Sequence, residues 1–345
     1  MLMHEFIAKI GKGQKASKDL TWDEAKQAMR MLIEGQATPV QVGAFLLAMR
    51  MKMESISELA GFTSAAREYV APVPIPPQVP LVDLPTYAGK QDTFHALIAS
   101  AIVAVAGGAA VLMHGCEGAP GRVGSDSLLA QLGIPVDLDP KRVAQEVATK
   151  GFGYLDIALY HPPVARFLDL RKDLGVRNFF HPIAKMLNPA RAQSQVIGLT
   201  HPPYFEKTVE ALKMLGSRRA LVIRGVEGDP ELSLAAVTRV LELRDERVMP
   251  LQLQPKDVGL GMGSFSAMAA CAPDQEAALL RRILQGEAHG GQRDWVVLNA
   301  AMLLYAAGKA VSISAGVSSA LQSLESGAAA RKLAELAGAK EPVNV

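Results

Sequence analysis

Cysteine is scarce in this sequence of 345 residues. Cys116 and Cys271 are too few to build a metal cluster from cysteine thiolates. The first residues also lack the charged and apolar pattern of a signal peptide. A chain with so little cysteine and no export signal is expected in the reducing cytoplasm.

A large net charge of either sign is absent as well. The 36 lysines and arginines nearly balance the 34 aspartates and glutamates, which leaves a formal net charge of +2. A protein that binds nucleic acid with most of its surface carries a large basic excess, so this class is excluded. Any basic binding surface has to be local.

Long hydrophobic runs are limited to one segment, residues 96–113. Its length approaches that of a membrane-spanning helix. Gly107 and Gly108 divide it, however, and His95 and His114 stand at its two ends. The segment therefore predicts a buried helix followed by a buried strand.

Apolar residues are plentiful, at 49% of the chain, and the length suits about two domains. Residues 1–70 predict a small bundle of three helices, which begin at the capping residues Thr21, Thr38 and Ser55. The proline-rich segment 72–80 predicts an extended linker.

Strand-like and helix-like segments alternate after this linker. Strands are predicted at 81–84, 109–113, 219–225 and 248–254, and helices at 93–106, 125–132, 140–149, 205–215, 231–243, 274–286 and 294–307. This alternation predicts an α/β domain with a mostly parallel sheet. We expect a helical domain of residues 1–72 plus helices within about 160–190, and an α/β domain of 81–159 and 191–338.

Several segments together resemble the anthranilate phosphoribosyltransferase family. They include "LTWDEAKQAMRMLIEGQATPVQVGAFLLAMRMK", "LMHG", "GFGYLDIALYHPPVARFLDLRKDLGVRNFF", "LNPA" and "RALVIRGVEGDPELSLAAVTRVLEL". The likeness spans about residues 5–325 and implies a class II nucleoside phosphorylase-like fold, with a homodimer formed through the helical domain.

The resemblance is weakest at the loop that binds the diphosphate of the donor, phosphoribosyl pyrophosphate (PRPP). The family has a glycine-rich turn whose backbone N–H groups surround the diphosphate. Here the turn reads Pro85, Thr86, Tyr87, Ala88, Gly89. Pro85 has no N–H, and Tyr87 is expected to fill the space of a phosphate. The family's next phosphate and metal contacts are replaced by residues 95–98, His-Ala-Leu-Ile.

Other family positions are kept only in part. His114, Gly115 and Ser125 match the substrate pocket, and Arg122 stands at a lysine position, but Cys116 and Glu117 replace an Asn-Arg pair. The family's magnesium-binding Asp-Glu pair is reduced to the remnant Glu231, with Asp229 one residue out of register. Arg177 matches the arginine of substrate recognition. The remaining pocket is therefore expected at Thr86, Gly89, His114, Gly115, Ser125 and Arg177.

These departures favour a degenerate transferase with no catalytic residue, bound metal or cofactor. The resemblance to a divergent branch of the family implies a homodimer that binds DNA or RNA with little sequence preference. Basic residues in a loop near the N-terminus and around the old pocket suit this hypothesis. The expected nucleic-acid contacts are Lys12, Lys15, Lys18, Lys90, Arg122, Arg171, Lys172, Arg177, Lys185 and Arg191.

The alternative is an active phosphoribosyltransferase with a modified donor site. It would use PRPP and Mg²⁺, with Glu231 and Asp229 on the metal and Arg177 on the carboxylate of anthranilate or a related aromatic acid. A nucleoside or base phosphorylase is a third possibility, which the altered glycine loop disfavours equally.

Overall fold

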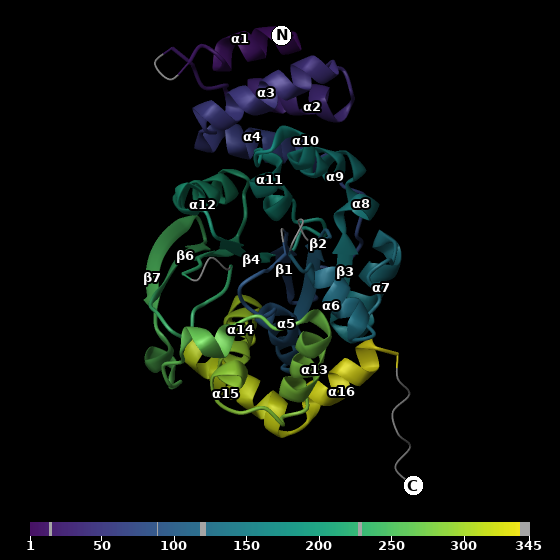
Figure 1. The fold of residues 1–345 in the computed structure, drawn as a ribbon, viewed down its shortest axis with the longest axis vertical. Coiled ribbons are helices and arrows are strands. Elements are labelled where there is room, and N and C mark those ends of the chain that lie inside the picture. The colour runs from purple at the N-terminus through teal and green to yellow at the C-terminus, as the bar shows by residue number, and fades with distance from the viewer. Residues whose placement is uncertain (14–15, 88, 118–121, 227–229, 339–345) are drawn as a thin grey trace.

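The computed structural model describes residues 1–13, 16–87, 89–117, 122–226 and 230–338. Four helices form the N-terminal bundle at one end of the molecule (Figure 1). They are α1 (Met3–Ile10), α2 (Trp22–Ile33), α3 (Pro39–Lys52) and α4 (Ile56–Arg67). The three predicted helices are confirmed, and α1 is an addition.

Capping explains where these helices begin. Thr21 accepts a hydrogen bond from the backbone N–H of Glu24 at 3.2 Å, and the Glu24 carboxylate accepts one from Thr21 N at 2.7 Å. Thr38 and Ser55 start α3 and α4 with the same reciprocal pair. Each cap satisfies backbone donors that the first helical turn leaves without partners.

Seven strands within the described residues form one sheet in the order β3-β2-β1-β4-β5-β6-β7. The first five strands in sequence pair in parallel. β6 pairs antiparallel with β5, and β7 pairs antiparallel with β6. Their bounds are β1 (Leu81–Thr86), β2 (Ala110–Gly115), β3 (Phe152–Asp156), β4 (Ser194–Leu199), β5 (Arg219–Arg224), β6 (Thr238–Arg244) and β7 (Arg247–Leu253). The predicted fold class, a small helical part and a larger α/β part with a mostly parallel sheet, is confirmed.

Helices cover both faces of the sheet, as Figure 1 shows. The remaining elements are α5 (Ala96–Ala106), α6 (Ser125–Gln131), α7 (Pro140–Lys150), α8 (Ile157–Tyr160), α9 (Pro162–Asp169), α10 (Arg171–Leu174), α11 (Phe180–Met186), η1 (Pro202–Tyr204), α12 (Phe205–Met214), η2 (Pro255–Val258), η3 (Phe265–Met268), α13 (Pro273–Leu284), α14 (Gly291–Ala306), α15 (Ile313–Glu325) and α16 (Ala328–Leu336).

Two hydrophobic cores lie on the two faces of the sheet. Neighbouring residues of β4 alternate between them, with Val196 in the core that contains α5 and α14, and Ile197 in the other. The second core continues into the N-terminal bundle through residues such as Phe45 and Phe62. The bundle is therefore joined to the larger part by shared apolar packing rather than by the linker alone.

The prediction for residues 96–113 is confirmed. They form the buried helix α5 and most of the buried strand β2, which lies between β3 and β1 in the sheet. In the described part of the chain, no helix has the length and apolar character needed to cross a membrane.

The predicted helix at 231–243 is wrong, because Thr238–Arg244 is the strand β6. Its burial alternates in part along the strand, and it pairs with β5 and β7. Asp245 and Glu246 both have positive φ, 48° and 64°, which makes the two-residue turn to β7. Such turns match the twist of a hairpin, so the local pairing overrides the helical pattern of the sequence.

The strand order creates a defined opening at one edge of the sheet. From β1 the chain proceeds to β2 and β3 on one side, and from β4 to β5 on the other. β1 and β4 are neighbours at this switch point, and they are parallel. In open α/β sheets, ligands bind beyond the carboxyl ends of the strands at such a point.

Candidate active site

A cavity of about 310 Å³ lies at this switch point. Its lining includes Thr86 at the end of β1 and Leu199 at the end of β4. The N-terminal bundle contributes Arg50 from α3, and the segment around α11 contributes Arg177 and Lys185. The volume falls in the range of small-molecule sites, about 300–1,000 Å³.

Tyr87, in the altered loop after β1, lines the cavity and is also held in the core. Tyr87 is 8% exposed, and its hydroxyl lies 2.8 Å from Nδ1 of His114 and 2.6 Å from the hydroxyl of Tyr160. Tyr87 anchors the loop to the core, since buried hydroxyls require partners. That Tyr87 fills the space of a phosphate stays a prediction.

His114 is part of the same buried network. Its Nε2 lies 3.1 Å from the Asp83 carboxylate, and both side chains are fully buried. Gly115 follows in β2, where a Cβ would lie 2.5 Å from the carbonyl oxygen of Thr86. Of the residues expected in the old pocket, His114 and Gly115 therefore hold the strands together and are not among the described lining residues.

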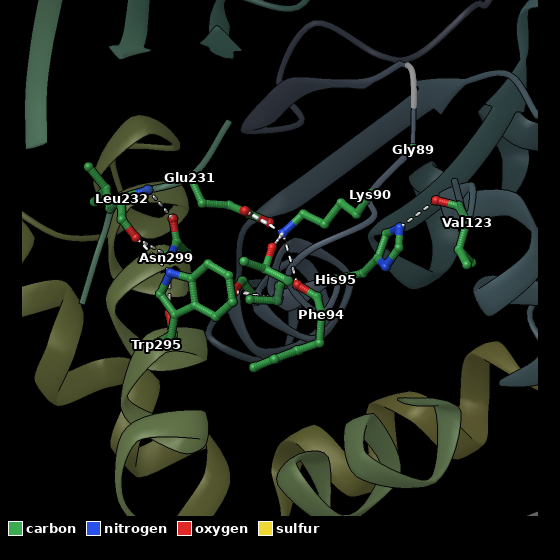
Figure 2. Close-up of polar contacts among 12 residues, drawn as sticks. Gly89, Lys90, Phe94, His95, Val123, Glu231, Leu232, Trp295 and Asn299 are labelled. Carbon is green, nitrogen blue, oxygen red and sulfur yellow. Dashed lines mark hydrogen bonds and ion pairs between the residues drawn. The ribbon is translucent and has the colours of Figure 1, made fainter. Parts of the chain in front are cut away.

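Lys90 lines the cavity and is at the centre of a group of polar contacts, which we call the inner part of the site (Figure 2). Its ammonium donates to the Glu231 carboxylate, to the Phe94 carbonyl at 2.8 Å and to Thr93 Oγ1 at 3.2 Å. It also lies 4.8 Å from the ring centroid of Trp295. Lys90 and Glu231 are both buried, so this is an ion pair built into the protein.

A second built-in pair lies at the first turn of α5. One oxygen of Glu276 lies 2.6 Å from the backbone N of His95 and 2.6 Å from its Nδ1. Both side chains are buried, and His95 Nε2 lies 2.9 Å from the Val123 carbonyl. A carboxylate of the protein thus takes the place where a helix N-terminus favours an anion. We call Lys90–Glu231 and His95–Glu276 the inner pairs.

The outer part of the cavity contrasts with these pairs because it carries several cations and little negative charge. Arg122 donates to the Gly89 carbonyl at 3.2 Å, and Lys185 donates to the Gly198 carbonyl at 2.6 Å. In the part of the chain that the structure describes, no ion pair is formed by the four cations that we call the cationic wall: Arg50, Arg122, Arg177 and Lys185.

Burial and the crowding of these cations both lower pKa values at the cavity. Desolvation and then repulsion by neighbouring arginines lower the pKa of Arg177. Desolvation, followed by repulsion from Arg177, lowers the pKa of Lys185 to about 8. Desolvation, together with the same cations, lowers the pKa of His181 to about 4. A negatively charged ligand would relieve this repulsion, so the cavity is suited to anions.

The residues expected from sequence are only partly brought together. Thr86, Gly89, Arg122, Ser125 and Arg177 all line the cavity, as do Lys90, Lys185 and Glu231. Gly89 adopts a φ of 62°, which a glycine tolerates without strain. Lys15 and Asp229 lie outside the described residues.

Other expected basic residues lie away from the cavity lining. Lys12 and Lys18 are exposed, and Lys18 N donates to the carbonyl of Lys9 in α1. Lys172 is exposed and pairs with Asp169 at 3.4 Å, and Arg191 belongs to a different concave surface, between α4 and the segment before β4. Arg171 belongs to α10 and acts on the cavity only through its charge.

The sequence reasoning missed Arg50, His181 and His201, all of which line the cavity. Arg50 stands in the last turn of α3, far from the sheet residues in sequence. A basic residue there is usual because it complements the helix dipole, so the pattern offered no signal for a site.

Comparison with known proteins supports the fold and identifies the family. A glycosyl transferase family model for the helical bundle domain matches residues 4–70, and one for the α/β domain matches residues 80–330. An anthranilate phosphoribosyltransferase of Methanocorpusculum labreanum is 35% identical over 331 residues, which cover 96% of this chain and 97% of that protein. That of Geobacillus kaustophilus is 34% identical, with 99% of each chain covered.

Solved structures give the same result. The crystal structure of anthranilate phosphoribosyltransferase from Thermus thermophilus superposes with a TM-score of 0.87 at 34% identity, covering 97% of this chain and 98% of the other. The Saccharomyces cerevisiae enzyme in complex with PRPP and Mg has a TM-score of 0.85 at 21% identity, with 98% and 97% covered. The second likeness concerns the fold alone.

The nucleic-acid hypothesis is wrong in the light of these relatives. Proteins alike over nearly the whole chain are named as phosphoribosyltransferases, and nothing in the comparisons points to DNA or RNA binding. The physical reason lies in how the basic residues are distributed. Lys90 is buried in an ion pair, Arg122, Arg177 and Lys185 face a small cavity, and Lys12 and Lys18 lie apart from them.

A divalent metal does not fit the described residues of the cavity. Glu231 is the one carboxylate among its described lining residues, and the Lys90 ammonium already occupies one of its oxygens. The described chain contains no group of three or more His, Cys, Asp or Glu side chains placed to hold a metal. Magnesium prefers one or two carboxylates that are free to bind it, in octahedral geometry.

Proposed function

This chain belongs to the anthranilate phosphoribosyltransferase family, and on that premise we propose that it is an active phosphoribosyltransferase with a modified donor site. Its substrates are PRPP and an aromatic acid that carries an amine, either anthranilate or a close relative. The observation that carries the proposal is the cationic wall, where four cations without ion-pair partners in the described chain face one cavity at the switch point of the sheet.

The reaction joins the amine nitrogen of the acceptor to C1 of the ribose. The bond between C1 and the pyrophosphate oxygen breaks, the pyrophosphate leaves with the electron pair, and the nitrogen loses a proton. Such a transfer needs orientation of the two substrates and stabilisation of the charge that develops on the leaving group. Cations that line one cavity suit both needs.

The donor site differs from a glycine-rich phosphate loop. Pro85 has no N–H to donate, and the backbone N–H of Lys90 is already bonded to the Val123 carbonyl at 2.9 Å. We therefore assign the phosphates to side chains, principally Arg122 and Lys185. Gly89 allows the loop to turn at this point, since its φ is 62°.

Arg177 is assigned to the carboxylate of the acceptor. It lines the cavity and has no ion-pair partner in the described chain, and its planar guanidinium suits two parallel hydrogen bonds to a carboxylate. Its lowered pKa follows mainly from desolvation and then from neighbouring arginines, so a bound carboxylate also removes repulsion.

A turnover assay tests the proposal. Purified protein with PRPP and anthranilate is followed by loss of anthranilate fluorescence and by detection of released pyrophosphate. Arg177→Lys is expected to raise the KM for the acceptor about 10- to 100-fold, since about 1.5–3 kcal/mol of charged hydrogen bonding is lost. The control Lys172→Gln changes an exposed residue outside the cavity and leaves turnover unchanged. Absence of turnover both with anthranilate and with other aromatic carboxylic acids that carry an amine on the ring would contradict the proposal.

We also propose a homodimer through the helical part, with residues 1–72 and the helices within about 160–190 acting as one unit. Val40, Leu47 and Met51 lie on one side of α3 and are 82%, 51% and 66% exposed, which is unusual for such large apolar groups. Light scattering is expected to give twice the mass of the chain. Leu47→Glu should shift the protein to monomers, and a wild-type monomer would refute the proposal.

A further inference from the structure

We infer that this cavity binds the pyrophosphate of its donor without a divalent cation, and that the ammonium of Lys90 takes the place of the metal beside Glu231. The inference rests on the proposed function, because it concerns the same site and donor. It makes this chain different from the S. cerevisiae relative, whose structure holds PRPP and Mg.

The surroundings of Lys90 are those that a small cation requires. Three oxygen acceptors contact its Nζ: a Glu231 carboxylate oxygen, the Phe94 carbonyl and Thr93 Oγ1. An ammonium has three N–H donors, so this set satisfies all of them. Figure 2 shows the ammonium directed between these groups from the loop that follows Gly89.

Burial makes this arrangement hard to displace. The side chains of Lys90 and Glu231 are 7% and 1% exposed. Moving the ammonium away to admit a metal would leave a buried charge without its acceptors, which is a large cost in a protein interior. The cation–π contact with Trp295 at 4.8 Å adds to this cost.

The second inner pair lies where the resemblance to the family predicts a contact with phosphate. The Glu276 carboxylate accepts from the backbone and from the ring of His95, at the start of α5. An anion of the protein therefore occupies the first turn of this helix, and a phosphate placed there would meet a negative charge. Both positions are already filled by side chains of the chain itself.

The positive charge that remains for pyrophosphate belongs to the cationic wall. Arg122 and Lys185 each make a hydrogen bond to a backbone carbonyl, and neither makes an ion pair in the described chain. Magnesium ordinarily neutralises the charge that develops on a leaving pyrophosphate. Four fixed cations can supply a comparable positive potential without any metal.

Calorimetric titration with inorganic pyrophosphate and with PRPP tests the inference. Each titration is done twice, once with a chelator and once with excess Mg²⁺. We expect binding in the chelator, with Mg²⁺ leaving the Kd unchanged within about threefold or weakening it, because the metal neutralises the free ligand. Binding that requires Mg²⁺, or that it strengthens about tenfold or more, overturns the inference while the proposed function stands. Absence of binding under both conditions overturns the inference and the proposed function together.

A variant at Glu231 provides a second, independent measurement. Glu231→Gln removes the charge of the carboxylate and keeps its shape, so a site that held a metal there would lose metal-dependent binding. We expect Glu231→Gln to bind pyrophosphate in the chelator within about threefold of the wild type. The matched variant Arg122→Gln is expected to weaken binding about tenfold in the same buffer. Equal affinity of Arg122→Gln and wild type, or a tenfold loss in Glu231→Gln alone, contradicts the assignment.

If Glu231→Gln does not fold, Mn²⁺ bound to the wild-type protein can be detected directly. Its electron paramagnetic resonance signal in the presence of pyrophosphate is expected to match that of protein-free Mn²⁺ pyrophosphate. A signal broadened by the wild-type protein and restored by excess Mg²⁺ would show a protein-bound metal and refute the inference.

Discussion

Charged side chains are paired in the inner part of the site and unpaired among the described residues of the outer part of the cavity. In the inner part, Lys90 is paired with Glu231 and His95 with Glu276. In the outer part, Arg177 and Lys185 face the cavity with their pKa values lowered by desolvation and by other cations. The comparison separates structure from function, because paired buried charge holds the fold and crowded like charge stores repulsion for a ligand to relieve.

The largest expected effect comes from breaking an inner pair. Lys90→Met leaves Glu231 buried without its cation, and we expect a loss of about 3–5 kcal/mol in the free energy of unfolding. Urea denaturation followed by circular dichroism measures it. The double variant Lys90→Met with Glu231→Met removes both charges and is expected to recover much of the loss.

The control for this prediction is the surface pair of Lys172 with Asp169, whose side chains are 64% and 75% exposed. Lys172→Met should change the unfolding free energy by no more than about 0.5 kcal/mol. If Lys90→Met were equally mild, the inner pair would not have the structural role that we give it.

The next effect sharpens the contrast by changing the cationic wall. Arg177→Gln is expected to weaken binding of the aromatic acid about 10- to 100-fold, through loss of a charged hydrogen-bonding pair. Its unfolding free energy should stay the same or rise, since repulsion with nearby arginines is removed. Calorimetry and urea denaturation on the same preparation measure the two quantities. A clear fall in the unfolding free energy would mean that Arg177 stabilises the fold, as the inner pairs do.

A smaller effect is the pH dependence of Lys185. Its pKa is about 8 in the folded protein, below the unfolded value of 10.5, so the unfolded chain binds more protons between these values. Stability should therefore rise with pH through this window, while pyrophosphate affinity should fall above about pH 8 as the ammonium is lost. The Arg177 and Glu231 charges act on the same amine.

Lys185→Arg is the matched control, because a guanidinium keeps its charge over this range. The fall in affinity above about pH 8 should flatten in this variant. An unchanged pH profile would assign the titration to another group.

The smallest effect is expected where the same charge lies outside the cavity. Lys12 and Lys18 are exposed beside α1. The double variant Lys12→Gln with Lys18→Gln should alter PRPP affinity and unfolding free energy by no more than about 0.5 kcal/mol. A larger change in affinity, measured by calorimetry, would mean that long-range charge rather than the cavity governs binding.

Sequence patterns predicted the parts of the molecule that depend on local rules. Capping boxes at Thr21, Thr38 and Ser55 gave the helix starts, and buried apolar runs gave β1, β2 and β5. Thr238–Arg244 was missed because its pairing with β5 and β7 outweighs a helical pattern. β4 was also missed, because its polar start at Ser194 and Gln195 and the glycine Gly198 interrupt the apolar run by which strands of the same length were recognised.

Three of the four cations of the cationic wall were predicted from sequence, but the pairings of the site were not. Arg122, Arg177 and Lys185 were named from sequence, and all line the cavity. The partner of Lys90 lies 141 residues away at Glu231, and no local pattern links them. The same distance problem hid the direction of the Tyr87 side chain, which depends on His114 and Tyr160 in other elements.

The most direct test is a crystal structure of the wild-type protein soaked with PRPP in a metal-free buffer. We predict that the pyrophosphate group lies within hydrogen-bonding distance of Arg122 or Lys185, with Lys90 still bonded to Glu231 and His95 to Glu276. A pyrophosphate seated at the first turn of α5, with Glu276 displaced and added Mg²⁺ bound to Glu231, would contradict the account.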